Sequence, residues 1–324
     1  MLQINLEKAI EQLKKNNFKK ILVQIPEGLK TRTDEIALEL EKNDFEIITI
    51  MDPCFGACDI KIEEAKKLNC DALLHIGHSE FIKTDFPVVY APLEYKLKNL
   101  ETFLKKILDY LNENQIKKIG FVTTIQYINY LGEIKDYFNK NSIGVNSKSG
   151  EKTIESQVLG CNYSSVPIEE NILYFGDGLF HPLGIHFATK KEVIIANPLT
   201  LEIKKLDKEK NDFLRKRILL IERAKDVSSY GILVSTKVGQ NKIIFARKIK
   251  KMLEEKGKSV KIFAMDYISE DKLLGTNVGA YINTACPRLS IDDYSNYKKP
   301  MINAFEVKYL LGENYDNYAL DMIY

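Results

Sequence analysis

Short apolar runs alternate with amphipathic segments along the whole chain. In the first hundred residues, apolar runs at 19–29, 45–52 and 71–79 are separated by segments at 33–43 and 60–68 with helical periodicity. Apolar runs that do not alternate with polar residues are typical of parallel strands covered on both faces. The pattern therefore predicts strands and helices in alternation, as in βαβ units.

The same order of elements occurs twice more. Strands are predicted at 117–127 and 171–180 around a helix at 130–139, and again at 230–240, 259–266 and 278–287 with a helix at 242–256. The first and last strands of the three units are 52, 54 and 49 residues apart. This repetition predicts an α/β fold of three similar doubly wound parallel-sheet domains, a triplicated unit around a central cavity. We place the domains at 1–98, 99–207 and 208–324, because charged segments join the units there.

Composition and charge limit the binding partners and the cellular location that we expect for the protein. The 324 residues carry 47 basic and 45 acidic side chains, a net charge of +2, so we expect no direct nucleic-acid binding. The first 17 residues have the pattern of a charged amphipathic helix and not of a secretory signal. The chain has no uncharged run near the roughly 20 residues of a membrane span, so we expect no membrane association and a cytoplasmic location. There, five cysteines are expected to be thiols or metal ligands.

Three cysteines are distributed one to each unit. Cys58 and Cys286 come just after predicted strands, whereas Cys161 follows a segment that fits a short strand or an irregular loop. Ligands of such sheets bind beyond the carboxyl ends of the strands, where three thiolates can converge. They would hold three irons of a [4Fe–4S] cluster and leave the fourth iron open to a substrate. The ordinary alternative is three buried apolar cysteines.

The remaining cysteines and the first histidines have simpler interpretations. Cys54 lies four residues before Cys58, but the loop has no second cysteine pair and no nearby pair of histidines, so no zinc site is predicted. Cys70 is interpreted as a packing residue. His75 lies on a strand and is expected to be a structural histidine. For His78, in the following turn, the sequence leaves two placements open, one in the cavity and one in the protein interior.

Glycine-containing turns at the strand ends are candidate ligand contacts. They are the turn 77–79, the pair Asp177 and Gly178 followed by His181, and the segment STKVGQ at 235–240. Glycine allows close approach of backbone to a ligand, and amides that open a helix favour an anion such as a carboxylate. The alternative is that they are ordinary turns. Asp292 and Asp293 are interpreted as helix caps in preference to contacts with a cationic group.

Seven segments of the chain together resemble a known family. QIPEGL, PCFGACD, HIGHS, VLGC, GDGLFHPLG, STKVGQ and NTACPRLSIDD occur in the order found in the archaeal 2-(3-amino-3-carboxypropyl)histidine synthases, the first enzymes of diphthamide biosynthesis. The resemblance extends from about residue 21 to residue 293. It implies three similar domains, each giving one cysteine to a [4Fe–4S] cluster, with Cys58, Cys161 and Cys286 as the ligands. Cys54 and Cys70 lie outside the ligand set.

The resemblance also implies an activity. Such an enzyme transfers the 3-amino-3-carboxypropyl group of S-adenosylmethionine, as a radical generated at the cluster, to a histidine of translation elongation factor 2, and releases methylthioadenosine. The CxxxCxxC loop of other radical S-adenosylmethionine enzymes is absent from this sequence. An unidentified electron donor and a homodimer are implied as well. From the turns above, we expect cosubstrate contacts at Gly77, His78, Ser79, Asp177, Gly178, Lys237, Gly239 and Gln240.

Three other functions are compatible with three α/β units. A quinolinate synthase-like enzyme would use a three-cysteine cluster as a Lewis acid, without S-adenosylmethionine. An iron–sulfur protein that only transfers electrons to a catalytic partner would keep the three cysteines. A three-lobed ligand-binding protein without a cluster would be colourless after anaerobic purification.

Overall fold

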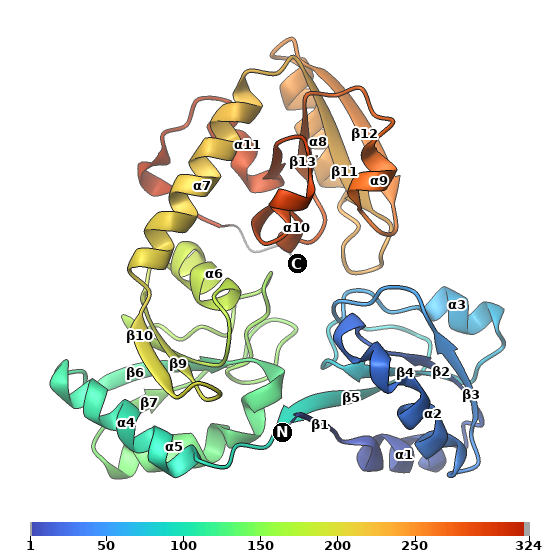
Figure 1. Cartoon of the computed structure of the whole chain (residues 1–324), viewed down its shortest axis with the longest axis vertical. Helices are drawn as coiled ribbons and strands as arrows, with labels where there is room; N and C mark the ends of the chain where they lie inside the picture. The colour runs from blue at the N-terminus through green and yellow to red at the C-terminus, as the bar shows by residue number, and fades with distance from the viewer. Residues whose placement is uncertain (1, 321–324) are drawn as a thin grey trace.

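The computed structural model of the chain describes residues 2–320 and has three lobes, each built on its own sheet. Figure 1 shows the lobes at the corners of a triangle. The first sheet has the order β1-β5-β4-β2-β3, in which only the pairing of β1 with β5 is antiparallel. Its elements are β1 (Leu2–Ile4), α1 (Leu6–Lys15), β2 (Lys20–Gln24), η1 (Glu27–Arg32), α2 (Thr33–Glu41), β3 (Glu46–Ile50), α3 (Ile62–Lys67), β4 (Ala72–Gly77) and β5 (Val88–Tyr95).

The second sheet repeats this plan with the order β10-β9-β8-β6-β7, and its antiparallel pair is β10 with β9. Its elements are α4 (Leu100–Glu113), β6 (Lys118–Thr123), η2 (Ile125–Tyr130), α5 (Leu131–Lys140), β7 (Gly144–Asn146), β8 (Asn171–Phe175), α6 (Phe180–Thr189), β9 (Glu192–Asn197) and β10 (Glu202–Lys205). Residues 147–170, which include Cys161, form an irregular loop with isolated bridges only.

The third sheet is wholly parallel, with the order β12-β11-β13-β14. The long helix α7 (Lys208–Lys225) leads from the second lobe into it (Figure 1). The other elements are β11 (Ser229–Ser235), α8 (Ile243–Glu254), β12 (Ser259–Met265), α9 (Glu270–Leu273), β13 (Ala280–Asn283), α10 (Arg288–Ile291), η3 (Tyr294–Asn296), β14 (Met301–Asn303), η4 (Ala304–Glu306), α11 (Val307–Leu310) and η5 (Tyr315–Asn317).

All three sheets share a core of four parallel strands in one order. In each, the first strand of that core lies between the second and the third, and the fourth lies beyond the third. All six residues of β4 are buried, as expected for a strand covered on both faces. The predicted α/β class with largely parallel sheets is therefore confirmed. Among residues 2–320, no helix is long and apolar enough to cross a bilayer.

Packing joins the lobes to different extents. One apolar core runs from the second lobe into the third and includes residues of α6, α7 and the segment up to Leu320. The first lobe has separate cores and meets the second through aromatic residues. The Tyr95 ring stacks on Tyr127 with centroids 5.1 Å apart, and the Tyr130 hydroxyl donates to the Tyr95 carbonyl at 2.9 Å. The aromatic contacts thus hold the end of β5 against η2 of the second lobe.

Candidate iron–sulfur centre

Cys58 lies in the loop between β3 and α3 and is bound by the third lobe. The Gly239 amide donates to the Cys58 carbonyl at 2.9 Å, and the Gln240 side-chain amide donates to the Cys58 sulfur at 3.2 Å. Next to them, the Lys237 ammonium pairs with the carboxylate of Asp59, and both side chains are buried. The segment STKVGQ therefore positions Cys58 and contacts its sulfur directly.

Gly239 also allows this close approach sterically. A Cβ added at Gly239 would lie 2.7 Å from both the Cα and the Cβ of Cys58 and 2.8 Å from its carbonyl oxygen. Cβ atoms essentially never come within 3.0 Å of such atoms, so any other residue would force the two loops apart.

Cys161 is placed by the irregular loop of the second lobe. Leu159 and Asn162 exchange backbone hydrogen bonds of 3.0 and 3.1 Å around it, which closes a tight turn. The Gln157 side-chain amide donates to the Ser79 hydroxyl at 2.7 Å and so connects this loop to the first lobe. The turn that carries Cys161 is therefore attached to the first lobe beside the loops at the centre.

Cys286 follows β13 and precedes α10. Its carbonyl accepts hydrogen bonds from the Asn283 side-chain amide at 2.7 Å and from the Leu289 amide at 3.2 Å. Behind α10, the buried guanidinium of Arg217 donates to the Ser290 carbonyl. These contacts hold the turn that carries the third cysteine.

The three thiols lie near enough to one another for their charges to interact. Each is half-buried and free of disulfides. Burial, and then the negative charge that the other two cysteines would carry, raise the pKa of Cys161 to about 12. Burial and the charge of Cys58 likewise raise the pKa of Cys286 to about 12, and burial raises the pKa of Cys58. Three neighbouring thiolates repel one another unless cationic metal lies between them, so the donor set fits a metal cluster.

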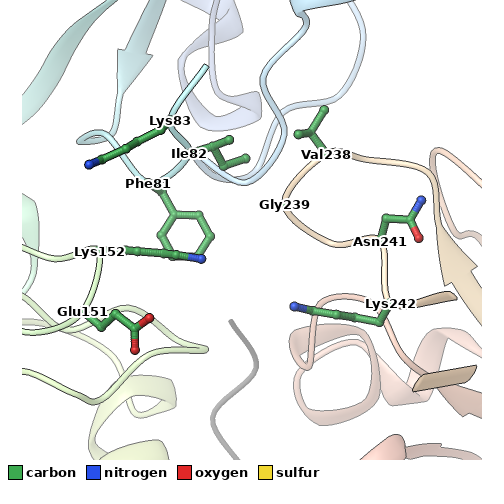
Figure 2. Close-up of a pocket in the computed structure, with 9 residues that line it drawn as sticks. All are labelled: Phe81, Ile82, Lys83, Glu151, Lys152, Val238, Gly239, Asn241 and Lys242. Atoms are coloured by element: carbon green, nitrogen blue, oxygen red, sulfur yellow. The ribbon is translucent and has the colours of Figure 1, made fainter. Parts of the chain in front are cut away.

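A cavity of about 660 Å³ opens beside this centre, and loops of all three lobes line it (Figure 2). Figure 2 shows Phe81 and Lys152 on one side of it and Lys242 on the other. The Lys152 ammonium lies 5.8 Å from the centre of the Phe81 ring. Burial and then the charge of Lys152 lower the pKa of Lys242. Its lining residues are Phe81, Ile82, Lys83, Glu151, Lys152, Val238, Gly239, Asn241 and Lys242. Positive charge there suits a ligand with a carboxylate.

The expected cosubstrate residues lie in several places. Gly239 lines the large cavity, whereas Gly178 lines a second one of about 170 Å³ near β9 and β10. Asp177 is exposed and accepts a 3.5 Å hydrogen bond from the Tyr127 hydroxyl. The ring of His181 stacks on Tyr174, with the centroids 6.0 Å apart.

Three of those residues are engaged with the Cys58 loop. The Gly239 amide, the Gln240 side chain and the Lys237 ammonium bind Cys58 and Asp59 as described above, and the Gln240 backbone amide donates to the Lys237 carbonyl at 3.0 Å. We had expected these groups to bind a carboxylate of the cosubstrate. Their cosubstrate role stays a prediction, and the contacts in the structure show that they hold the loop that carries Cys58.

Gly77, His78 and Ser79 form the turn after β4. The positive φ of Gly77, +93°, reverses the chain, and His78 then lies with its Nδ1 3.0 Å from the Nε2 of His75. Cys54 lies beside both histidines. The expectation that Cys54 has no nearby pair of histidines was therefore wrong. Because β2 lies between β3 and β4 in the sheet, the loop that follows β3 crosses the end of β2 and reaches the end of β4, where the two histidines lie.

Two further site features differ from the sequence analysis. Asp292 stands at the C-cap position of α10 and Asp293 at the N-cap position of η3, but neither side chain makes a capping hydrogen bond. The Asp292 carboxylate instead accepts a 2.8 Å hydrogen bond from Arg288, four residues earlier, which is the alternative contact with a cationic group. The cavity residues Phe81, Lys83 and Lys152 were missed. Phe81 and Lys83 lie within four residues of the predicted strand 71–79 but belong to no motif, and nothing in the sequence brings the loop of Lys152 to them. Lys242 directly follows the STKVGQN segment, and this position was the only indication in the sequence that Lys242 lies at the site.

Three largely parallel sheets, with one cysteine from the loops of each lobe near a common centre, define an α/β protein with a candidate three-cysteine metal site. Residues 25–319 match the family model of diphthamide synthesis proteins, and the chain belongs to this family. It is similar to the 2-(3-amino-3-carboxypropyl)histidine synthase of Pyrococcus horikoshii, with 36% identity over 99% of this chain and 94% of that protein. The synthase of Methanocaldococcus jannaschii is 34% identical over 98% of this chain and 91% of that protein.

Solved structures agree with this assignment. The crystal structure of Dph2 from Pyrococcus horikoshii with a 4Fe-4S cluster superposes with a TM-score of 0.91 at 34% identity, over 100% of this chain and 95% of that chain. Subunit 1 of the synthase of Caenorhabditis elegans is 30% identical over 93% of this chain and 78% of that protein. The similarity thus covers all three lobes and is not limited to the cysteine motifs.

Proposed function

We propose that this chain is a 2-(3-amino-3-carboxypropyl)histidine synthase, a transferase that catalyses the first step of diphthamide biosynthesis. It transfers the 3-amino-3-carboxypropyl group of S-adenosylmethionine to a histidine of translation elongation factor 2. The observation that carries the proposal is the grouping of Cys58, Cys161 and Cys286 from three lobes, in a fold that matches a cluster-containing Dph2 along its whole length.

Cys58, Cys161 and Cys286 would hold the cluster, and the residues around them fit it. A bound and reduced cluster would supply the electron that cleaves the bond from sulfur to the methionine γ-carbon of S-adenosylmethionine, with methylthioadenosine and a 3-amino-3-carboxypropyl radical as the products. Gln240 donates to the Cys58 sulfur and stabilises its negative charge. The buried pair of Lys237 with Asp59 holds the adjoining backbone.

S-adenosylmethionine would bind in the 660 Å³ cavity and against the strand-end turns. The ammonium groups of Lys152 and Lys242 beside that cavity support a place there for the methionine carboxylate. Gly77, His78, Ser79, Asp177, Gly178, Lys237, Gly239 and Gln240 remain our proposed contacts. Small residues among them give the close backbone approach that a ligand of this size needs.

Several finer points belong to the same proposal. Each lobe is a doubly wound domain of a triplicated unit, with limits at 1–98, 99–207 and 208–324; the shared strand order of the three sheets supports this. A homodimer, an unidentified electron donor and elongation factor 2 are the proposed partners. Five free thiols and a cluster sensitive to oxygen suit the reducing cytoplasm.

The activity is tested with anaerobically reconstituted protein, dithionite, elongation factor 2 and S-adenosylmethionine labelled in its carboxyl group. We expect label on the factor and an equal amount of methylthioadenosine, both lost in the Cys286→Ala protein. Label on a factor whose modified histidine has been replaced would mean non-specific addition. Cluster-loaded protein that forms neither product contradicts the proposal and favours a role in electron transfer alone.

A further inference from the structure

Cys54, His75 and His78 form a second group of metal-ligand side chains, separate from the three cluster cysteines. The Cys54 sulfur and one nitrogen of each histidine lie within 4.8 Å of one another. Cys54 and His75 are fully buried, and His78 is partly buried. We propose that this group binds a divalent transition metal of the zinc type and ties the loop that carries Cys58 to the end of β4.

The hydrogen bonds around His75 leave the correct nitrogen available to a metal. The Gln24 side-chain amide donates to the Asp59 carbonyl at 2.6 Å, and its oxygen accepts from the Lys61 amide at 3.3 Å, which fixes the orientation of the Gln24 amide. The same oxygen lies 3.1 Å from Nδ1 of His75, so that nitrogen carries the proton. Nε2 of His75 therefore carries a lone pair and no proton. Without a metal, this lone pair accepts the 3.0 Å hydrogen bond from Nδ1 of His78, and a bound metal would take that place. An oxygen acceptor behind a ligating histidine is the usual support of a metal site.

The spacing suits a tetrahedral ion. With zinc bonds of about 2.0–2.1 Å to nitrogen and about 2.3 Å to sulfur, ligand atoms lie about 3.3–3.6 Å apart. Nε2 of His75 and Nδ1 of His78 are 3.0 Å apart in the structure, so these two need little movement. The separations of up to 4.8 Å within the group require an adjustment of about 1 Å, which a side-chain rotation supplies.

The backbone builds the group from distant parts of the first lobe. Gly77, at φ +93°, makes the turn that brings His78 back over His75, and a Cβ there would lie 2.7 Å from the Cγ of Pro26. The Cys54 carbonyl accepts a 3.0 Å hydrogen bond from the Glu27 amide, which holds its loop against the start of η1. A thiolate and two imidazoles are ligands of zinc and related ions, and three protein ligands leave one position open to water. The Cys54 thiol releases its proton when the metal binds.

The site is tested on the cluster-loaded protein, with zinc as the probe. We expect about one zinc per chain in addition to the cluster iron, and a zinc-edge X-ray absorption spectrum with one sulfur and two imidazole ligands. Zinc affinity, measured by chelator competition, should fall more than about tenfold in Cys54→Ser and in His78→Gln. Cys70→Ser is the matched control, because Cys70 is a buried cysteine of the same lobe outside the group.

Iron content and circular dichroism of each variant show whether the fold is kept, and the two independent ligand variants guard against a folding defect in one. Zinc affinity unchanged in both variants would overturn the proposal. A zinc spectrum with two or three sulfur ligands would overturn it as well, since zinc would then occupy the cluster cysteines. The test does not depend on transferase activity.

Discussion

Replacement of Arg217 by Met should destabilise the third lobe more than any exposed substitution on the same helix. The Arg217 side chain is 2% exposed and that of Glu306 is fully buried. Nε of Arg217 donates to one carboxylate oxygen of Glu306 at 2.8 Å, and Nη2 pairs with the other oxygen. The guanidinium also donates to the Ser290 and Met301 carbonyls. One side chain thus joins α7, α10 and β14.

The cost follows from what Met leaves behind. Glu306 would keep only the Tyr318 hydroxyl at 2.6 Å and the Asn303 amide at 2.7 Å, and its buried charge would lose its counterion. Removal of one partner from a buried ion pair costs about 3–5 kcal/mol, and the two retained donors favour the lower end. We therefore expect the free energy of unfolding to fall by about 3 kcal/mol at neutral pH.

Urea unfolding of the anaerobically purified protein, followed by circular dichroism, measures this loss. Arg215→Met on the same helix is the matched control: Arg215 is exposed, and its loss should change the free energy by less than about 0.5 kcal/mol. The double variant Arg217→Met, Glu306→Gln should recover part of the loss, because no buried charge then remains. A fall below about 1 kcal/mol in the single variant would refute the reasoning.

Three more predictions concern the centre. Cys161→Ala should lose most of its iron and its transferase activity in parallel, as measured by iron analysis and the labelling assay, whereas Cys70→Ala should keep both. Full activity in the Cys161→Ala protein would show that Cys161 is not a cluster ligand. Gln240→Ala should keep the iron but lower the reduction potential, on the order of 50 mV or about 1 kcal/mol for one electron, because Cys58 loses its donor; an unchanged potential in redox titration would contradict this. Burial and the charge of Arg288 lower the pKa of His181 to about 4 from 6.5. Because its neutral form is favoured in the folded state, stability should fall as pH drops from 6.5 toward 4, by up to about 1.4 kcal/mol per pH unit, and His181→Gln should flatten that slope in urea titrations.

Several strands that are buried on both faces could be predicted from the sequence, although the buried strands β9 and β14 were missed. The runs 19–29 and 71–79 were recognised as strands because their apolar residues do not alternate with polar ones, and they contain β2 and β4. The strand β5 was missed because its burial alternates residue by residue, and β1 was missed because it is a three-residue edge strand. Such short or half-buried strands depend on their neighbours for pairing, and the local pattern does not contain those neighbours.

The site was predictable only in part for the same reason. Separations of 103 and 125 residues between the three cysteines hold no geometric information, so the resemblance of the motifs carried that assignment. The contact of Gln240 with Cys58 arises where two lobes meet, and the grouping of Cys54 with His78 arises from the order of strands. Both are tertiary relations between loops that no local pattern encodes.

Gly239 has a consequence for which sequences this fold can accept. Because the hydrogen atom on its Cα faces the backbone of Cys58, the distance between the first and third lobes is set by the absence of a side chain. Alanine there would act as a wedge of one methyl group between two lobes that must both supply a cluster ligand. A saturation library at this position, selected for iron content, should return glycine alone, while Gly275, whose added Cβ would meet open space, should tolerate many residues.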